Sequence, residues 1–491
     1  MLSHVGLHKG VNMQLSERII EIFREIARVP RQSKHEEKIA AWLVERAQKD
    51  GFEVERDANN NVVIRVPASV GYEHCPILVL QGHMDMVCEK TPTSTHNFAT
   101  DSIEVIIKDG WMQANGTTLG ADDGLGVATA LALVEDETVE HPPIEILITS
   151  DEETGMTGAC ALRAEQLKGR ILVNLDSEDE GVLTVGCTGG RETKSKLSLH
   201  RKPLMLDARG VRIHISGLLG GHSGTDIHCG RANAIKLATR IMQDVIRMTY
   251  NPQLVDIKAG SAHNAIPRDA VFTVAVSDVD VDKVVRRVEE LSKIFASEYA
   301  KTDSGIVVTA EVCDVSGNAY DYSSFCKVAD VLLVFPHGVA AMSQDIEGLV
   351  ETSVNLAAVR IADDTLRILS SQRSSIPSKL DAVTNRIASC MRLAGGSSLS
   401  NAGYPGWKPD MDSDLLKRLV TLYERRFCRK PVVDIIHAGL ECGIIGDKIP
   451  GMQMVSLGAT VVSAHSPLER AKVDTIPMIA DLMVDLFKSY K

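Results

Sequence analysis

Apolar and polar positions along this chain follow two different periods. Near the start, apolar residues recur at helical spacing, and further on they form short, nearly continuous runs. Such runs are typical of central strands in a sheet that is covered on both faces. Because strands and helices alternate, we expect an α/β layer architecture. The pattern predicts helices at 14–29, 34–49 and 124–134, strands at 61–66, 76–80, 144–149 and 171–175, and a hairpin at 103–114.

The order of the predicted elements changes in the middle of the chain, near Gly189-Gly190. From there it fits two tandem split β-α-β units of the ferredoxin-like kind. The first comprises strand 211–216, helix 232–248, strands 254–257 and 270–276, helix 281–301 and strand 305–313. The second comprises helix 322–335, strands 349–359 and 365–372, and helix 379–393.

A stretch rich in glycine, serine and proline, 395–406, is then expected to be a linker. After it the α/β pattern resumes, with helices at 413–426 and 475–490 and strands at 432–436 and 452–457. We therefore predict a discontinuous catalytic domain of residues 1–190 and 400–491, with a mostly parallel mixed sheet covered by helices. Residues 191–399 are expected to be inserted in it as an α+β lid.

Composition restricts the partners that we expect. The 491 residues carry a formal net charge of -12 with dispersed Lys and Arg, so nothing offers the basic stripe that binds nucleic acid. The ten cysteines form no C-x-x-C pair, which indicates reduced thiols. Residues 1–11 contain no apolar signal segment, and no stretch approaches the roughly 18 apolar residues of a membrane span. We expect a cytoplasmic protein without nucleic-acid or membrane partners.

Histidine and carboxylate residues occur where predicted strands end or the chain turns sharply. In open α/β sheets, ligands collect beyond the carboxyl ends of the strands, so we expect these side chains to share one site. The motifs are Gln81-Gly82-His83-Met84-Asp85, Gly120-Ala121-Asp122-Asp123-Gly124, Ser150-Asp151-Glu152-Glu153-Thr154-Gly155, Asn174-Leu175-Asp176-Ser177-Glu178 and Ala464-His465-Ser466.

Their chemistry suits a pair of metal ions. Zinc accepts histidine nitrogen and carboxylate oxygen, and two ions about 3.5 to 4 Å apart can share one carboxylate and a water. Each ion then needs two further protein ligands. The chain offers five residues for these positions: His83, Asp122, Glu153, Asp176 and His465. The sequence thus predicts two divalent ions per chain, with zinc expected and cobalt or manganese as alternatives.

Two further acids have expected tasks beside these ligands. Asp85 is placed to orient and polarise the imidazole of His83. Glu152 adjoins Glu153 but points differently in extended backbone, so it is free to take a proton from a metal-bound water and pass it to a leaving amine. Taken singly, each motif can be a polar turn, a helix cap or a solvated loop. Their succession in the chain favours the metal site.

Together these motifs resemble the co-catalytic dizinc exopeptidases that include aminoacylases and glutamate carboxypeptidases. Within that clan the chain is most similar to the bacterial aminoacyl-histidine dipeptidases, also called Xaa-His or carnosinase-like dipeptidases. The similarity covers essentially the whole chain and includes Gly220-Gly221-His222-Ser223-Gly224, Gly230-Arg231-Ala232-Asn233-Ala234, Asn264-Ala265-Ile266-Pro267-Arg268 and His437-Ala438-Gly439-Leu440-Glu441.

The resemblance implies a task for each of several residues. It implies a cis peptide between Asp122 and Asp123. In the lid it implies that His222 steadies the tetrahedral oxyanion and that Asn264 holds the substrate backbone. The metal ligands divide as follows: Asp122 bridges the ions, His83 and Asp176 complete one site, and Glu153 and His465 complete the other. Arg373 is expected at the terminal carboxylate, because a guanidinium binds a carboxylate through two parallel hydrogen bonds, and Gly439 is a further contact.

We therefore expect a metallo-dipeptidase that hydrolyses unblocked dipeptides and favours Xaa-His substrates, including β-alanyl-histidine. One alternative is an N-acyl-amino-acid amidohydrolase of the same clan, which would share the metal site. The other is a non-catalytic binding protein with a vestigial site. The two units of the lid suggest an internal pseudo-dimer, and a homodimer through another surface is left open.

Overall fold

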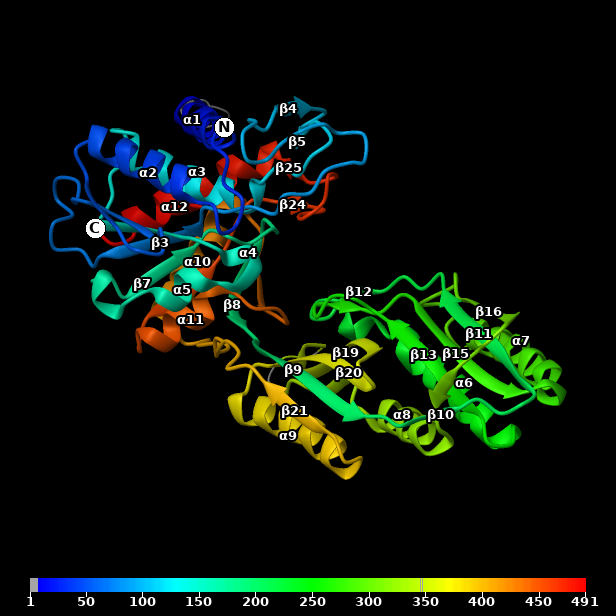
Figure 1. Ribbon diagram of the computed structural model, residues 1–491. Helices are drawn as coiled ribbons and strands as arrows, with labels where there is room; N and C mark the ends of the chain where they lie inside the picture. The colour runs from blue at the N-terminus through cyan, green and yellow to red at the C-terminus, as the bar shows by residue number, and fades with distance from the viewer. Residues whose placement is uncertain (1–7, 345, 347) are drawn as a thin grey trace. The chain divides into compact units, whose positions relative to one another are not determined.

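The computed structural model describes residues 8–344, 346 and 348–491 (Figure 1). Most of the N-terminal segment in which we expect no signal peptide therefore lies outside the described residues. The chain divides into two compact units. Unit 1 comprises Met1–Cys187, Trp407–Ile435 and Leu440–Lys491, and unit 2 comprises Thr188–Gly406 and Ile436–Gly439.

Unit 1 is built on an eight-stranded mixed sheet. Its strands, in spatial order, are β1 (Glu53–Arg56), β2 (Val62–Val66), β6 (Ile144–Thr149), β3 (Leu78–His83), β7 (Ile171–Asn174), β23 (Gln453–Ser456), β8 (Val182–Cys187) and β22 (Val432–Ile436). The four central strands from β6 to β23 are parallel, whereas β2 and β8 join them antiparallel. Every residue of β3 and β6 is buried, which explains their continuous apolar runs.

Helices lie on both sides of this sheet, with α1, α3 and α12 on one side and α5 and α11 on the other (Figure 1). They are α1 (His8–Ile26), α2 (Glu37–Lys49), α3 (Ala121–Glu135), α4 (Glu152–Gly155), α5 (Thr157–Ala161), α10 (Asp414–Phe427), α11 (Glu441–Lys448) and α12 (Ile476–Lys488). Helix α3 packs against β3 and is buried almost all round, so it has no polar face. None of the described helices combines the length and apolarity that a membrane crossing requires.

A small second sheet in unit 1 joins two short strands from the C-terminal part of the chain to the predicted hairpin. The hairpin consists of β4 (Val105–Lys108) and β5 (Trp111–Ala114). Strand β25 (Arg470–Lys472) pairs with β5, and β24 (Val461–Val462) pairs with β25. The loop between β24 and β25 is thereby fixed to unit 1.

Unit 2 contains a large antiparallel sheet, with four helices packed side by side against it in the order α7, α6, α8, α9, and a separate two-stranded sheet of β12 and β14. Its first half comprises β11 (Ala208–Ser216), α6 (Ala234–Met248), β13 (Gln253–Ala259), β15 (Ala270–Ser277), α7 (Val281–Glu298) and β16 (Val307–Cys313). Its second half comprises β9 (Gly189–Ser198), α8 (Tyr322–Val334), β19 (Val350–Ala362), β20 (Thr365–Ser374), α9 (Pro377–Leu393) and β21 (Ser397–Ser400). Short strands complete the unit: β10 (Arg201–Pro203), β12 (Gly221–His222), β14 (Ala265–Ile266), β17 (Asn318–Tyr320) and β18 (Gly338–Met342).

Each half is a split β-α-β unit, and the two are continuous through the pairing of β13 with β19. In the chain, the first half is inserted between β9 and α8 of the second half. The stretch 395–406, expected to be a linker, contributes β21, which pairs with β9 and completes the second half.

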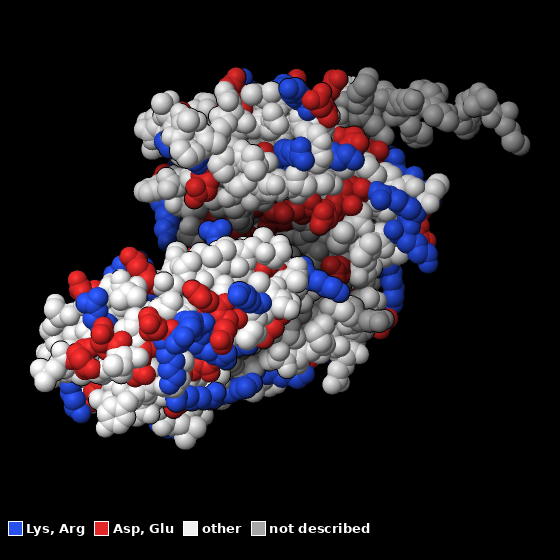
Figure 2. Space-filling view, turned by 90° about the vertical axis from the view of Figure 1, so that its right-hand side faces the viewer, with Lys and Arg blue, Asp and Glu red and all other residues white. Residues whose placement is uncertain are grey.

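Lys, Arg, Asp and Glu are interspersed on the face seen in Figure 2, without a continuous basic stripe.

Candidate functional site

Five side chains from separate parts of unit 1 meet where the central strands end. His83 ends β3, Asp122 is the second residue of α3, Glu153 lies in α4, Asp176 follows β7 and His465 lies between β24 and β25. His83 Nε2 lies 3.0 Å from Asp122 Oδ1 and 3.4 Å from Asp176 Oδ1. His465 Nε2 lies 3.0 Å from Asp122 Oδ2 and 2.9 Å from Glu153 Oε2. The structure thus brings together all five residues that we expect to bind metal.

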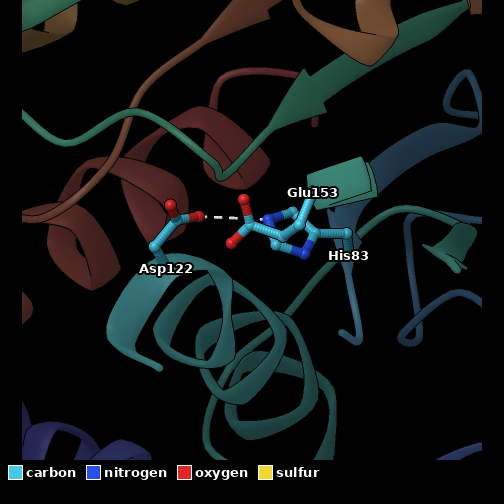
Figure 3. A group of neighbouring side chains, drawn as sticks. All are labelled: His83, Asp122 and Glu153. Atoms are coloured by element: carbon cyan, nitrogen blue, oxygen red, sulfur yellow. Dashed lines mark hydrogen bonds and ion pairs between the residues drawn. The ribbon is translucent and has the colours of Figure 1, made fainter. Parts of the chain in front are cut away.

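The Asp122 carboxylate presents each of its oxygens to a different imidazole. Figure 3 shows His83, Asp122 and Glu153 pointing toward one another, and their nearest ligand atoms lie within 4.8 Å of each other. Ligand atoms that each lie about 2 Å from one zinc ion are separated by roughly 3 to 4 Å. The distances of 2.9 to 3.4 Å from the two imidazoles to the three carboxylates agree with that separation. The peptide bond between Asp122 and Asp123 is cis, as the resemblance implied. A carboxylate in this position is suited to bridging two ions.

The charges and donor atoms of the cluster fit a divalent cation. Three carboxylates face two imidazoles, and Glu153 Oε1 is buried without a hydrogen-bond partner among the described residues. Buried charged groups are normally paired or bound to a metal. Carboxylate oxygen and imidazole nitrogen are ligands for zinc, and also for cobalt and manganese.

Two buried residues hold the turn that presents Asp122. The Glu469 carboxylate accepts hydrogen bonds from the main-chain N–H groups of residues 119–121, at 2.8, 3.0 and 2.7 Å. The Arg31 guanidinium donates to the carbonyl oxygen of Gly120. Gly120 has a φ of +69°, and a side chain there would collide with Arg31. These contacts fix the start of α3 against the end of β3.

Asp85 is completely buried and connects β3 to the loop that carries the acidic pair. Its Oδ1 lies 3.4 Å from His83 Nδ1. Its carboxylate also accepts hydrogen bonds from the N–H groups of Glu152 at 3.0 Å and Glu153 at 3.2 Å, and from the Ser33 hydroxyl at 2.8 Å. Burial disfavours its charge, but the nearby His83 first, and then the hydrogen bonds from Ser33 and Glu152, outweigh burial and lower the pKa of Asp85. The ionised Asp85 therefore orients both the imidazole and residues 152–153.

Glu152 begins α4, directly before the proposed ligand Glu153. Burial raises the pKa of the Glu152 carboxyl well above its usual value; His83 opposes the shift, and the nearby Asp176 and Glu153 add to it. A carboxyl group with a raised pKa can both take up and release a proton near neutral pH. This property suits a general base that later acts as a general acid.

His222 lies in the short strand β12 of unit 2, which pairs with β14. Its main-chain N–H donates to Asp226 at 2.8 Å, and its Nδ1 accepts a hydrogen bond from the N–H of Thr225 at 3.2 Å. Because Nδ1 accepts, we assign the proton of the neutral ring to Nε2, which can donate to a ligand. Asn264, on the loop before β14, is exposed, and its carbonyl accepts the N–H of Ser223 at 2.7 Å.

Arg373 lies in β20 of unit 2 and is 6% exposed. Its guanidinium donates to the Tyr404 hydroxyl at 2.9 Å, and no carboxylate of the described residues forms an ion pair with it. Its Nε has no hydrogen-bond partner among the described residues. Gly439 is half-buried between β22 and α11. A buried guanidinium without a counter-ion is suited to binding an anionic ligand.

Comparison with known proteins places the chain in a family. Residues 79–489 match Peptidase family M20/M25/M40, and this range includes the whole His and carboxylate cluster of unit 1. The chain belongs to this family. Because its members are metallopeptidases, membership implies that a divalent metal is bound.

Individual relatives extend the comparison over nearly the full chain. The chain is 38% identical to the cytosol non-specific dipeptidase of Escherichia coli (strain K12) over 468 residues, which cover 95% of this chain and 96% of the relative. It is also 38% identical to the crystal structure of aminoacylhistidine dipeptidase from Vibrio alginolyticus, with a TM-score of 0.84 and 96% of each chain covered. Aminopeptidase PepT from Bacillus cereus, 17% identical over 97% of this chain and 98% of that one, shares the fold with a TM-score of 0.56. These similarities confirm the predicted α/β fold and the resemblance to dipeptidases.

Sequence analysis identified Asp85 but missed three other residues that support the site. Arg31 and Glu469 contact the turn that presents Asp122. Arg31 lies 89 residues and Glu469 about 350 residues away from it in the sequence, so no local sequence pattern predicts either contact. Glu441 was noted only as part of the His437 motif. It is buried beneath the site, where it accepts hydrogen bonds from Gln81 at 2.6 Å and Thr149 at 2.5 Å.

Proposed function

We propose that the chain is a metallo-dipeptidase that hydrolyses unblocked dipeptides and favours Xaa-His substrates, including β-alanyl-histidine. The observation that carries this proposal is the Asp122 carboxylate, whose two oxygens lie between His83 and His465 beside two further acids. The two relatives that are 38% identical over nearly the whole chain are themselves named as dipeptidases.

The same cluster would hold two divalent ions, with zinc as the expected metal. Asp122 would bridge them, with His83 and Asp176 at one ion and Glu153 and His465 at the other. When bound, such a pair of ions polarises the scissile carbonyl and makes water a better nucleophile at neutral pH.

The protein groups around that cluster have separate tasks. Asp85 holds the His83 ring and the main chain of residues 152–153 in place. Glu152 takes a proton from the attacking water and then donates a proton to the leaving amine, since a raised pKa allows both steps.

Unit 2 supplies the substrate contacts of the proposed reaction and acts as the lid. His222 donates from Nε2 to the developing oxyanion. Asn264 binds the substrate backbone, and Arg373, with Gly439, binds its terminal carboxylate. The proposed domains are therefore a catalytic domain of residues 1–190 and 400–491 and a lid of residues 191–399. The two tandem units of the lid support a reaction that needs no partner subunit.

The cytoplasm is the proposed location, because the E. coli relative is named as a cytosol enzyme. Small peptides are the proposed partners. A homodimer would use a surface away from the residues named above.

A substrate panel tests this function. Purified protein should hydrolyse carnosine and other unblocked dipeptides, lose that activity after chelation and regain it when zinc, cobalt or manganese is added. N-acetyl-amino acids should be poor substrates. The opposite preference would identify an amidohydrolase, and hydrolysis of neither class with metal present would support a binding protein.

A further inference from the structure

We propose that Tyr404 is a positioning residue for Arg373, and that its hydroxyl thereby sets the affinity for substrates with a free terminal carboxylate. The inference rests on the proposed function, in which Arg373 binds that carboxylate. It assigns a task to Tyr404, which lies in the stretch that the sequence pattern predicted to be a linker.

Main-chain pairing aligns three residues on neighbouring segments of unit 2. Arg373 in β20 is the partner of Gly190 in β9. On the other side of β9, Gly190 and Tyr404 exchange two main-chain hydrogen bonds, of 3.1 and 3.0 Å. Tyr404 is therefore fixed two segments away from Arg373, with Gly190 between them, a separation of about 10 Å at the usual strand spacing.

The glycine between them allows the tyrosine side chain to cross that separation. A Cβ atom at Gly190 would collide with the hydroxyl oxygen and the nearest ring carbons of Tyr404. The ring therefore lies across β9 where this residue has no side chain. Its hydroxyl then accepts a hydrogen bond from Arg373 Nη1 at 2.9 Å.

The surroundings leave the Arg373 charge uncompensated within the described protein. Arg373 forms a hydrogen bond to the neutral Tyr404 hydroxyl, and no carboxylate of the described residues is paired with it. His437 faces the same region, and burial, together with the charge of Arg373, lowers the pKa of His437 to about 3. His437 therefore stays neutral, and the guanidinium is the cation that remains for an anionic ligand.

A fixed guanidinium binds a carboxylate better than a mobile one. Arginine loses side-chain freedom when it binds, and a residue that already holds it in place reduces that loss. The Tyr404 hydroxyl accepts one hydrogen bond from Arg373 Nη1, and the guanidinium has further N–H groups that can bind the ligand. The expected effect is therefore on substrate binding, because the groups proposed for proton transfer belong to unit 1.

The test compares Tyr404→Phe with the unmodified protein in steady-state dipeptide hydrolysis. The variant keeps the ring and removes the hydroxyl. We expect KM to rise about tenfold, the size typical of a hydrogen bond to a charged group, with kcat within about twofold. Tyr250→Phe is the matched control, because Tyr250 is 87% exposed, and should leave both constants unchanged.

A double-mutant cycle separates positioning from a general structural effect. In an Arg373→Lys background the guanidinium is absent, so Tyr404→Phe should change KM little further. Full additivity of the two substitutions, or an unchanged KM in Tyr404→Phe alone, overturns the inference while the proposed function stands. Absence of dipeptide hydrolysis in the metal-loaded unmodified protein overturns the proposed function, and the inference with it.

Discussion

The Asp85 carboxylate accepts a hydrogen bond from the main-chain N–H of Glu152 at 3.0 Å. The same carboxylate lies 3.4 Å from the His83 ring, so one buried acid orients a proposed metal ligand and the segment that carries the proposed general base. Asp85→Asn replaces one acceptor oxygen by a donor, and the amide cannot accept as many of these hydrogen bonds.

Asp85→Asn should therefore lower kcat by about 10- to 100-fold and weaken metal binding, as is typical when the partner of a metal-bound histidine is changed. Steady-state kinetics and metal titration measure both effects. Asp314→Asn is the control, because the Asp314 side chain is 93% exposed. An Asp85→Asn variant with unchanged kcat and metal affinity would show that the contact does not support the site.

Glu152→Gln should separate proton transfer from metal binding. The amide cannot take up a proton, so kcat should fall by about 10²- to 10⁴-fold, whereas the metal content should stay unchanged because Glu152 is not a proposed ligand. Kinetics and elemental analysis of the same preparation give both values, and Glu137→Gln on an exposed turn is the control. Retention of full activity would contradict the proposed role of Glu152.

The bridging position of Asp122 has a stoichiometric consequence. Asp122→Ala should remove ligands from both ions, whereas Asp176→Ala should weaken the ion bound with His83 and leave the other. Metal titration should then show little binding at either site in the first variant and one remaining equivalent in the second. Equal metal content in the two variants would argue against a bridging role for Asp122.

His337 in unit 2 predicts a pH dependence of stability. Its Nδ1 accepts a hydrogen bond from the N–H of Leu356 at 3.3 Å, and burial, aided by the charge of Lys236, lowers the pKa of His337 to about 4. An unfolded histidine has a pKa near 6.5, so between these values the unfolded chain binds a proton that the folded chain does not. The free energy of unfolding should fall by about 3 kcal/mol as the pH is lowered from about 6.5 to about 4.

His337→Gln should remove this part of the pH dependence. Thermal unfolding at a series of pH values, for the variant and the unmodified protein, measures the difference. If Tm of the two proteins changes in parallel over the whole range, His337 does not carry the effect.

The sequence predicted the buried strand β6 but missed the buried strand β8 and the long strand β9. All six residues of β6 are buried, four of them are Ile or Leu, and its predicted bounds agree with the structure. Strand β9 was missed because Thr193 and Ser195 point to its buried side. Their hydroxyls bind those of Ser400 and Ser398 in β21, which explains why β21 had the composition of a linker.

The proposed metal ligands could be found from the sequence because each follows a strand or a sharp turn with a short recognisable motif. Asp85 could be found in the same way, but Glu469 could not, since it contacts the Asp122 turn from a loop about 350 residues away. The Tyr404 contact with Arg373 depends on the pairing of β9 with β20 on one side and with Tyr404 on the other. The spacing of apolar and polar residues does not predict this pairing.

Metal content measured together with activity tests the central claim most directly. The purified protein should contain two equivalents of a divalent metal per chain, lose carnosine hydrolysis as a chelator removes them, and recover it in proportion as zinc, cobalt or manganese is restored. Carnosine hydrolysis at an unchanged rate by protein shown to contain no metal would contradict the account.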